Sequence, residues 1–203
     1  SETLESQYQE LYDGKISIII GTQVVAKGLD LPLLRTVGVI QADAGLALPD
    51  FAAPERTFQL LAQVVGRVGR SSHETTIVVQ TYQPEAVAIR MGIAQDYKSF
   101  YEATLAERRR AGFPPFTYLL KLTCSYKTEA AAIRNAQQLA ATITQRHLSV
   151  RVLGPTPAFY ERQRDQYRWQ LTIKSSSRKV LTDICSELPG AHWQFDIDPY
   201  SLL

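Results

Sequence analysis

The second half of the chain constrains the fold most, because strand and helix patterns follow one another there in a regular order. Residues 117–126 alternate apolar and polar side chains, as a strand with one buried face does. A helix follows after Thr128, a favourable amino-terminal cap, with apolar residues three and four apart up to Ile143. The series continues with a strand "SVRVLG", a loop "GPTPAFYERQRDQ", a strand "YRWQLTIK", a helix "SSRKVLTDICSEL" and a strand "HWQFDID".

The order βαββαβ predicts a ferredoxin-like α+β domain of about 90 residues, in which two helices cover one antiparallel sheet. Alternation along "YRWQLTIK" places Trp169 among the apolar side chains of one face, in the core. Arg168 and Lys174 fall on the other face, which we expect to be exposed. Cys124 shares the apolar side of its strand and is expected to be a small core residue.

The first half predicts an α/β layer with a parallel sheet. Residues 3–13 have helical spacing, and the β-branched run "ISIII" is typical of a strand buried on both faces. Further strands are predicted at "TVGVIQAD" and "TTIVVQTY". The helix between them should turn four apolar residues inward: Phe58, Leu61, Val65 and Val68. No clear first strand precedes this series, so we expect a partial layer.

Between the two halves, residues 84–111 have a helical pattern that ends in three arginines, Arg108 to Arg110. The segment "GFPPF" then breaks it, because proline fixes φ and pushes the preceding residue out of helical space. We therefore expect three parts: residues 1–83, a helical linker at 84–115, and a carboxyl-terminal domain at 116–203.

Composition excludes several classes of protein. With 45% hydrophobic and 21% charged residues the chain is globular, and no apolar run approaches the roughly 20 residues of a membrane span. Two cysteines and three histidines do not make an ordinary four-ligand zinc site. No secretory leader pattern is present, so a cytoplasmic setting is expected.

Charge is unevenly distributed along the chain. Residues 1–80 hold 6 Lys and Arg against 9 Asp and Glu, whereas the remainder holds 16 against 11. The basic second half is compatible with a polyanionic partner and, equally, with an ordinary solvated surface.

The motif "QVVGRVGR" is the strongest indication of chemistry. Arg67 and Arg70 are three residues apart, so on a helix both would reach the same anion, and arginine suits phosphate better than lysine does. Gly66 and Gly69 leave room for a close approach. An arginine pair on the surface that binds carboxylates is the alternative.

A second motif, "GTQVVAKGLDLP", precedes this one by some 40 residues. Together they resemble the fifth and sixth motifs of superfamily 2 helicases, which implies a partial RecA-like lobe. The resemblance implies that Arg67 and Arg70 act catalytically on ATP, Arg70 as the arginine finger. It also implies further contacts: ATP binding by Gly28, Asp30 and Gln63, and nucleic-acid binding by Thr22, Gln23 and Lys27.

Further segments extend the resemblance over nearly the whole chain. "QADAGLALPDFAAPERTFQLLAQVVGRVGR", "LAERRRAGFPPF", "VLGPTPA", "YRWQLTIK" and "FDIDP" are similar to the carboxyl-terminal part of the primosomal replication-restart helicases. The implied function is ATP-dependent 3′–5′ DNA translocation and restart of replication at stalled forks. The implied partners are branched or single-stranded DNA, the single-stranded DNA-binding protein and primosome proteins. Ala52 departs from the family, which usually has arginine after "DF".

Several groups that the family uses are absent from these residues. There is no G-x-x-x-x-G-K-[ST] phosphate loop and no DEAH-like acidic box, so ATP and Mg²⁺ lack most of their ligands. The cysteine-rich zinc-binding segment is also missing. We therefore expect a fragment that is not catalytic alone. A non-catalytic DNA-fork or protein-binding module is the alternative, and a fork-remodelling or RNA helicase fits the "FDIDP" segment less well.

The carboxyl-terminal domain contains a second candidate site. Arg162, Arg164 and Arg168 occur among aromatic residues, a combination that neutralises phosphates and stacks on bases. Lys174, Arg178, Lys179, Tyr160, Tyr167, Trp169 and Trp193 complete the expected cluster. The alternative is a solvated loop beside a core tryptophan.

Overall fold

The computed structural model describes residues 9–10, 12–22, 34–66, 75–147 and 149–203. They form two compact units. The first comprises residues 1–48 and 53–103, and the second comprises residues 49–52 and 104–203. The short segment 49–52 therefore joins a unit that is remote from it in sequence.

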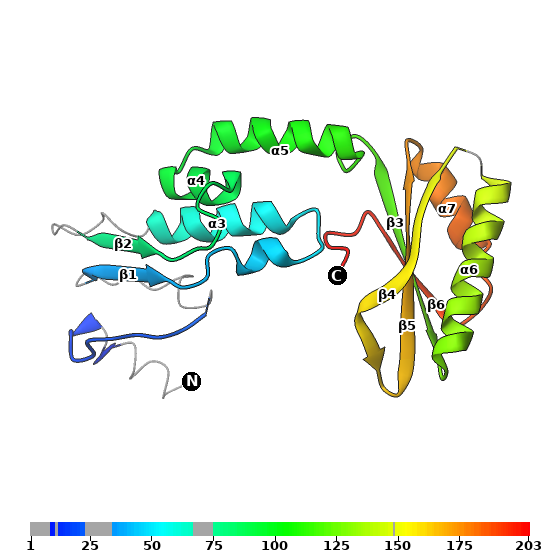
Figure 1. The fold of residues 1–203 in the computed structure, drawn as a ribbon, viewed down its shortest axis with the longest axis horizontal. Helices are drawn as coiled ribbons and strands as arrows, with labels where there is room; N and C mark the ends of the chain where they lie inside the picture. Colours follow the sequence, from blue (N-terminus) through cyan, green and yellow to red (C-terminus); the bar gives the residue numbers. More distant parts are fainter. Residues whose placement is uncertain (1–8, 11, 23–33, 67–74, 148) are drawn as a thin grey trace. The chain divides into compact units, whose positions relative to one another are not determined.

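The first unit is a parallel α/β layer, as predicted. Strand β1 (Thr36–Val39) pairs in parallel with β2 (Thr76–Val79), in register from Thr36 opposite Thr76 to Val39 opposite Val79. The connection contains the 3₁₀ helix η1 (Ala44–Ala47) and helix α3 (Ala53–Val65), and α4 (Val87–Ala94) follows β2 (Figure 1).

The core of this unit lies between α3, α4 and the first part of α5 (Tyr97–Ala111). Leu61 and Ile89 are fully buried, and the ring of Phe58 stacks on Phe100 with 4.1 Å between centroids. Gly92 allows α4 to approach α3, because an added Cβ would lie 2.8 Å from the Cβ of Leu61. On α3, Val64 is buried in place of the expected Val65.

The predicted buried strand at "ISIII" is wrong. Residues 16–20 have no strand hydrogen bonding, and the side chains of Ile18 and Ile20 are 78% and 93% exposed. A parallel strand is held in place by backbone hydrogen bonds to its neighbouring strands. Among the described residues β1 pairs only with β2, so no described strand pairs with residues 16–20.

The helical pattern expected over residues 84–111 is formed by two helices, α4 and α5, because the helix breaks at Gln95. This residue adopts a left-handed φ of 54°, and α4 ends there. Asp96 then begins α5 as its carboxylate accepts a hydrogen bond of 3.0 Å from the backbone N–H of Ser99. Residues 97–103 of α5 belong to the first unit and the rest to the second.

The second unit confirms the ferredoxin-like prediction. Its elements are β3 (Tyr118–Tyr126), α6 (Glu129–Arg146), β4 (Arg151–Gln163), β5 (Gln166–Ser175), α7 (Arg178–Ser186) and β6 (Trp193–Ile197). The four strands are antiparallel in the order β4-β5-β3-β6, and both helices cover one face of the sheet (Figure 1). Thr128 caps α6, as expected, by accepting a hydrogen bond of 3.3 Å from the Ala131 backbone N–H.

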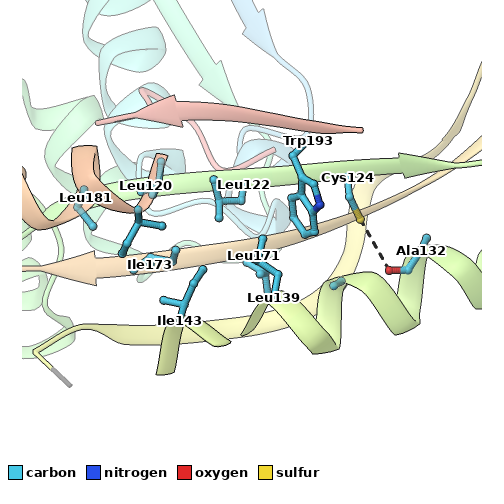
Figure 2. Close-up of a cluster of buried hydrophobic side chains, with 12 residues drawn as sticks. Leu120, Leu122, Cys124, Ala132, Leu139, Ile143, Leu171, Ile173, Leu181 and Trp193 are labelled. Atoms are coloured by element: carbon cyan, nitrogen blue, oxygen red, sulfur yellow. Dashed lines mark hydrogen bonds between the residues drawn. The ribbon is translucent and has the colours of Figure 1, made fainter. Parts of the chain in front are cut away.

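The core under these helices is continuous and apolar (Figure 2). Leu122 and Leu171 lie in it fully buried, and Trp169 packs against it as predicted. Cys124 is fully buried, its Sγ lies 3.7 Å from the Ala132 carbonyl oxygen, and burial raises the pKa of its thiol. Trp193, expected in the basic cluster, is a core residue instead.

The opposite face of the sheet is partly covered, so Lys174 is not exposed as expected. Its side chain is buried, its Nζ donates to the Ala111 carbonyl oxygen at 2.9 Å, and it lies 3.3 Å from the centroid of the Phe113 ring. Burial is the main cause that lowers the pKa of Lys174, and the positive charge of the nearby Arg151 lowers this pKa further. Lys121 on the same face donates to the Leu203 carbonyl oxygen.

The segment "GPTPAFYERQRDQ" is mostly strand, where a loop was expected. β4 continues through it to Gln163, interrupted by two irregularities in its pairing with β5. β4 is an edge strand, and edge strands are among the few positions where a sheet tolerates proline. Gly154 has φ +96°, and an added Cβ would lie 2.9 Å from the Gln170 carbonyl oxygen. The first irregularity therefore requires glycine.

Candidate nucleotide and nucleic-acid sites

Most of the expected motor site lies outside the described residues. This applies to Gln23, Lys27, Gly28, Asp30, Arg67 and Arg70. Thr22 is exposed and lies outside any helix or strand, and Gln63 is half-buried in the last turn of α3. The backbone N–H of Gly66 donates to the Ala62 carbonyl oxygen at 2.9 Å, so the helical hydrogen bonds reach the residue before Arg67.

The carboxyl ends of β1 and β2 carry a polar cluster that the sequence motifs do not identify. Asp43 is buried, and its carboxylate accepts a hydrogen bond of 3.1 Å from the backbone N–H of Tyr82. The side-chain hydrogen bond from Thr81, followed by the Tyr82 N–H, lowers the pKa of Asp43. Nearby, the Gln80 side-chain oxygen accepts from the Gln41 N–H at 2.9 Å. Ligand sites of parallel sheets lie at this edge.

We expect Asp43→Asn to weaken the first unit in a pH-dependent way. A carboxyl whose folded pKa is lowered stabilises the fold above its unfolded value of about 3.9, and this contribution is lost as the pH falls through the folded pKa. Amide hydrogen exchange of β2, compared between the two proteins at each pH, should be faster in the variant at pH 6. The difference should vanish well below pH 3.9. An equal difference at every pH would mean that charge on Asp43 is not responsible.

The second candidate site is the end of the hairpin formed by β4 and β5. The strands are joined by Arg164 and Asp165, which have left-handed φ values of 50° and 58°. Two consecutive residues of this conformation form the tight turn that suits twisted antiparallel strands. The turn presents Arg164 at the tip, between the exposed Arg162 on β4 and the half-exposed Arg168 on β5.

Arg162 is held in place by two neighbours. Its guanidinium lies 5.4 Å from the centroid of the Tyr167 ring, the residue directly opposite it, and its Nη2 lies 3.3 Å from the Asp165 carboxylate. Both partners leave the guanidinium largely exposed, with 61% of the side chain accessible. The hairpin therefore presents a positioned cation to the solvent.

The rest of the expected basic cluster does not join this site. Lys174 is ten residues from Arg164 along β5, roughly 30 Å in an extended strand. Arg178, at the start of α7, makes an ion pair of 2.9 Å with Asp198. The structure thus places Arg162, Arg164 and Arg168 at the same end of the hairpin, with Arg168 on the opposite face of the sheet from Arg162 and Tyr167. It places Lys174, Arg178 and Lys179 at the other end of β5.

Other candidate features have ordinary structural surroundings. His192 stacks on Tyr126 with 4.7 Å between centroids, and His147 lies 3.4 Å from Glu187. Ala52, at the position where the resemblance leads us to expect arginine, is buried, and its N–H donates to the Asp50 carboxylate at 3.1 Å. In the part of the chain that the structure covers, no three His, Cys, Asp or Glu side chains gather as metal ligands. No helix in that part has the length and apolar character to cross a membrane.

Comparison with known proteins yields two family matches that together cover most of the chain. The helicase conserved C-terminal domain matches residues 1–72, and the primosomal protein N C-terminal domain matches residues 109–200.

Curated relatives agree with both matches. The replication restart protein PriA of Bacillus subtilis (strain 168) is 36% identical over 94% of this chain and 25% of its own length. That of Treponema pallidum (strain Nichols) is 34% identical over 98% of this chain and 32% of its own. The replication restart protein PriA of Haemophilus influenzae is 32% identical over 98% of this chain and 28% of its own length. The chain thus spans between a quarter and a third of the length of these relatives.

Proposed function

Since the chain belongs to the PriA family of replication restart proteins, whose carboxyl-terminal region it matches, we propose that it is part of an ATP-dependent DNA helicase. The proposed motor translocates 3′ to 5′ along DNA, recognises stalled forks and restarts replication by primosome assembly. Its partners would be branched or single-stranded DNA, the single-stranded DNA-binding protein and primosome proteins. The order of the two family matches along the chain supports this proposal.

In the motor reaction this chain would supply half of the nucleotide site. Arg67 and Arg70 would stabilise the charge on the transferred γ-phosphoryl group, while Gly28, Asp30 and Gln63 contact the nucleotide. Mg²⁺ and the β-phosphate need a phosphate loop and an acidic box, neither of which occurs in these residues. We therefore propose that the 203 residues alone do not hydrolyse ATP. Zinc would need ligands from outside them.

The proposal that the second unit binds DNA rests on one observation, the three arginines located at the same end of the β4–β5 hairpin. A guanidinium is weakly hydrated and binds phosphate through two parallel hydrogen bonds. The exposed Arg162 and the tip residue Arg164 would contact phosphates without disrupting the core. Arg168 would add a third contact from β5.

A salt series with fork DNA tests this assignment. We expect the triple variant Arg162→Ala/Arg164→Ala/Arg168→Ala to bind fork DNA more weakly. The slope of log K against log salt should flatten by roughly two to three, at about 0.7–0.9 for each of three lost phosphate contacts. The control, Lys127→Ala/Arg134→Ala/Lys179→Ala, removes the same charge from exposed positions of the same unit. Equal effects of the two triple variants would show that net charge alone matters, and would contradict a site at the hairpin.

A non-catalytic fork-binding or protein-binding module is the second candidate. It is favoured by the second unit, which has a complete sheet and a core of its own. The two functions are distinguished by measuring DNA-stimulated ATP hydrolysis in the longer protein, that is, in the helicase of which this chain is proposed to be a part. A module without a motor would show no such hydrolysis.

A further inference from the structure

The second irregularity of the hairpin produces an unusual arrangement of side chains. Pro157 lies opposite Trp169 and Arg162 lies opposite Tyr167, so residues 158–161 of β4 face the single residue Arg168 of β5. A bulge of this kind re-aims side chains and strengthens the local twist of the strand. The extra residues must leave the regular alternation between the two faces of the sheet.

Phe159 and Tyr160 show this effect directly. In a regular strand, consecutive side chains point to opposite faces. Here the two rings contact each other, with centroids 5.1 Å apart and planes at 82°. Ala158 is buried and anchors the bulge, whereas Phe159 is 45% and Tyr160 is 68% exposed. The bulge therefore keeps a pair of aromatic rings together at the surface.

Three arginines lie on the same part of the hairpin as this pair. Arg168 lies across from the bulge, Arg162 follows it by two residues and Arg164 is at the tip. The acidic residues are Glu161 and Asp165, and Asp165 is paired with Arg162. The segment from Phe159 to Arg168 thus carries three positive charges against two negative ones. Exposed rings beside arginines match a ligand that has both flat apolar faces and negative charge.

Single-stranded DNA has this chemistry, whereas duplex DNA hides the faces of its bases within the stack. We propose that Phe159 and Tyr160 form a stacking platform for unpaired bases of single-stranded DNA, whose phosphates the neighbouring arginines contact. This rests on the proposed function, in which the hairpin binds fork DNA. It adds that the hairpin selects the single-stranded arm or the junction of a fork over its duplex arms.

The test compares binding of the 203-residue chain to a single-stranded oligonucleotide and to a blunt duplex of equal length. We expect Phe159→Leu/Tyr160→Leu, which keeps apolar bulk and removes the aromatic faces, to lose at least tenfold in affinity for the single strand. Affinity for the duplex and the salt slope should not change, since no charge is removed. A 2-aminopurine base in the single strand should lose fluorescence with the original chain and not with the variant.

The matched control is Tyr118→Leu/Phe195→Leu, which removes two other exposed aromatic rings of the same unit. Tryptophan fluorescence checks folding, because Trp169 and Trp193 both lie in this unit. If the Phe159/Tyr160 variant binds the single strand as tightly as the control variant does, the stacking platform is wrong. The arginine site is tested separately by the salt series with the arginine triple variant. Equal loss on single strand and duplex, or a change in self-association, overturns it too. Failure of the original chain to bind either DNA overturns both proposals.

Discussion

Replacing Arg70 by lysine in the longer protein should lower kcat of DNA-stimulated ATP hydrolysis by about 10³-fold or more, within the range of about 10³–10⁵ associated with arginine fingers. Negative charge spreads over the γ-phosphoryl oxygens in the transition state, and the planar guanidinium binds two of them at once. An ammonium keeps the charge and loses this geometry. Arg67→Lys should act in the same direction.

The control for this experiment is Arg90→Lys, an exposed arginine of α4 in the same unit whose neighbour is Glu85 at 3.7 Å. This change should leave hydrolysis unaltered. Nucleotide binding should survive Arg70→Lys better than turnover does, since the finger acts mainly in the transition state. Full ATPase activity in the Arg70 variant would show that this motif does not take part in ATP hydrolysis. The non-catalytic module would then be favoured.

Local patterns predicted the second unit well because its elements satisfy one another within the same stretch of chain. The alternation of β3 has partners on both sides, β5 and β6, so its apolar side chains have a core to enter. The run "ISIII" carries an equally strong local signal, but no described strand pairs with it. Periodicity indicates the type of element that a segment favours, whereas burial depends on partners that the segment does not contain.

Errors elsewhere have the same origin in contacts distant along the chain. Lys174 is buried because Ala111 and Phe113 lie against it, more than 60 residues earlier in sequence. β4 continues through two prolines because it is an edge strand, and its position in the sheet is a property of the topology.

The candidate sites were predictable to different degrees. The spacing of Arg67 and Arg70 is a local property on which the resemblance to helicase motifs rests, but both residues lie outside the described part of the chain, so this site stays a prediction. The hairpin arginines are close in sequence, so their position at one end of the hairpin was predictable. The pairing of Phe159 with Tyr160 was not, because it depends on a bulge whose register against β5 no local pattern encodes.

The largest stability effect is expected from Leu122→Ala, which should lower the free energy of unfolding of the second unit by about 2–5 kcal/mol. Leu122 is fully buried in the middle of β3, one of the two central strands, and the helices on this face leave little room for the cavity to collapse. Both tryptophans lie in this unit, so urea unfolding followed by tryptophan fluorescence measures it specifically.

Phe195→Ala provides the comparison, because Phe195 lies directly opposite Leu122 on β6 and is 56% exposed. Its loss should cost no more than about 1 kcal/mol, although more carbon atoms are removed, since much of the ring is already in contact with water. If the two substitutions cost the same, the core under α6 and α7 would not be the close-packed cluster described above. If Leu122→Ala also weakened DNA binding at temperatures where the unit stays folded, the β4–β5 hairpin would be held in its active shape by this core, at a distance from the ligand.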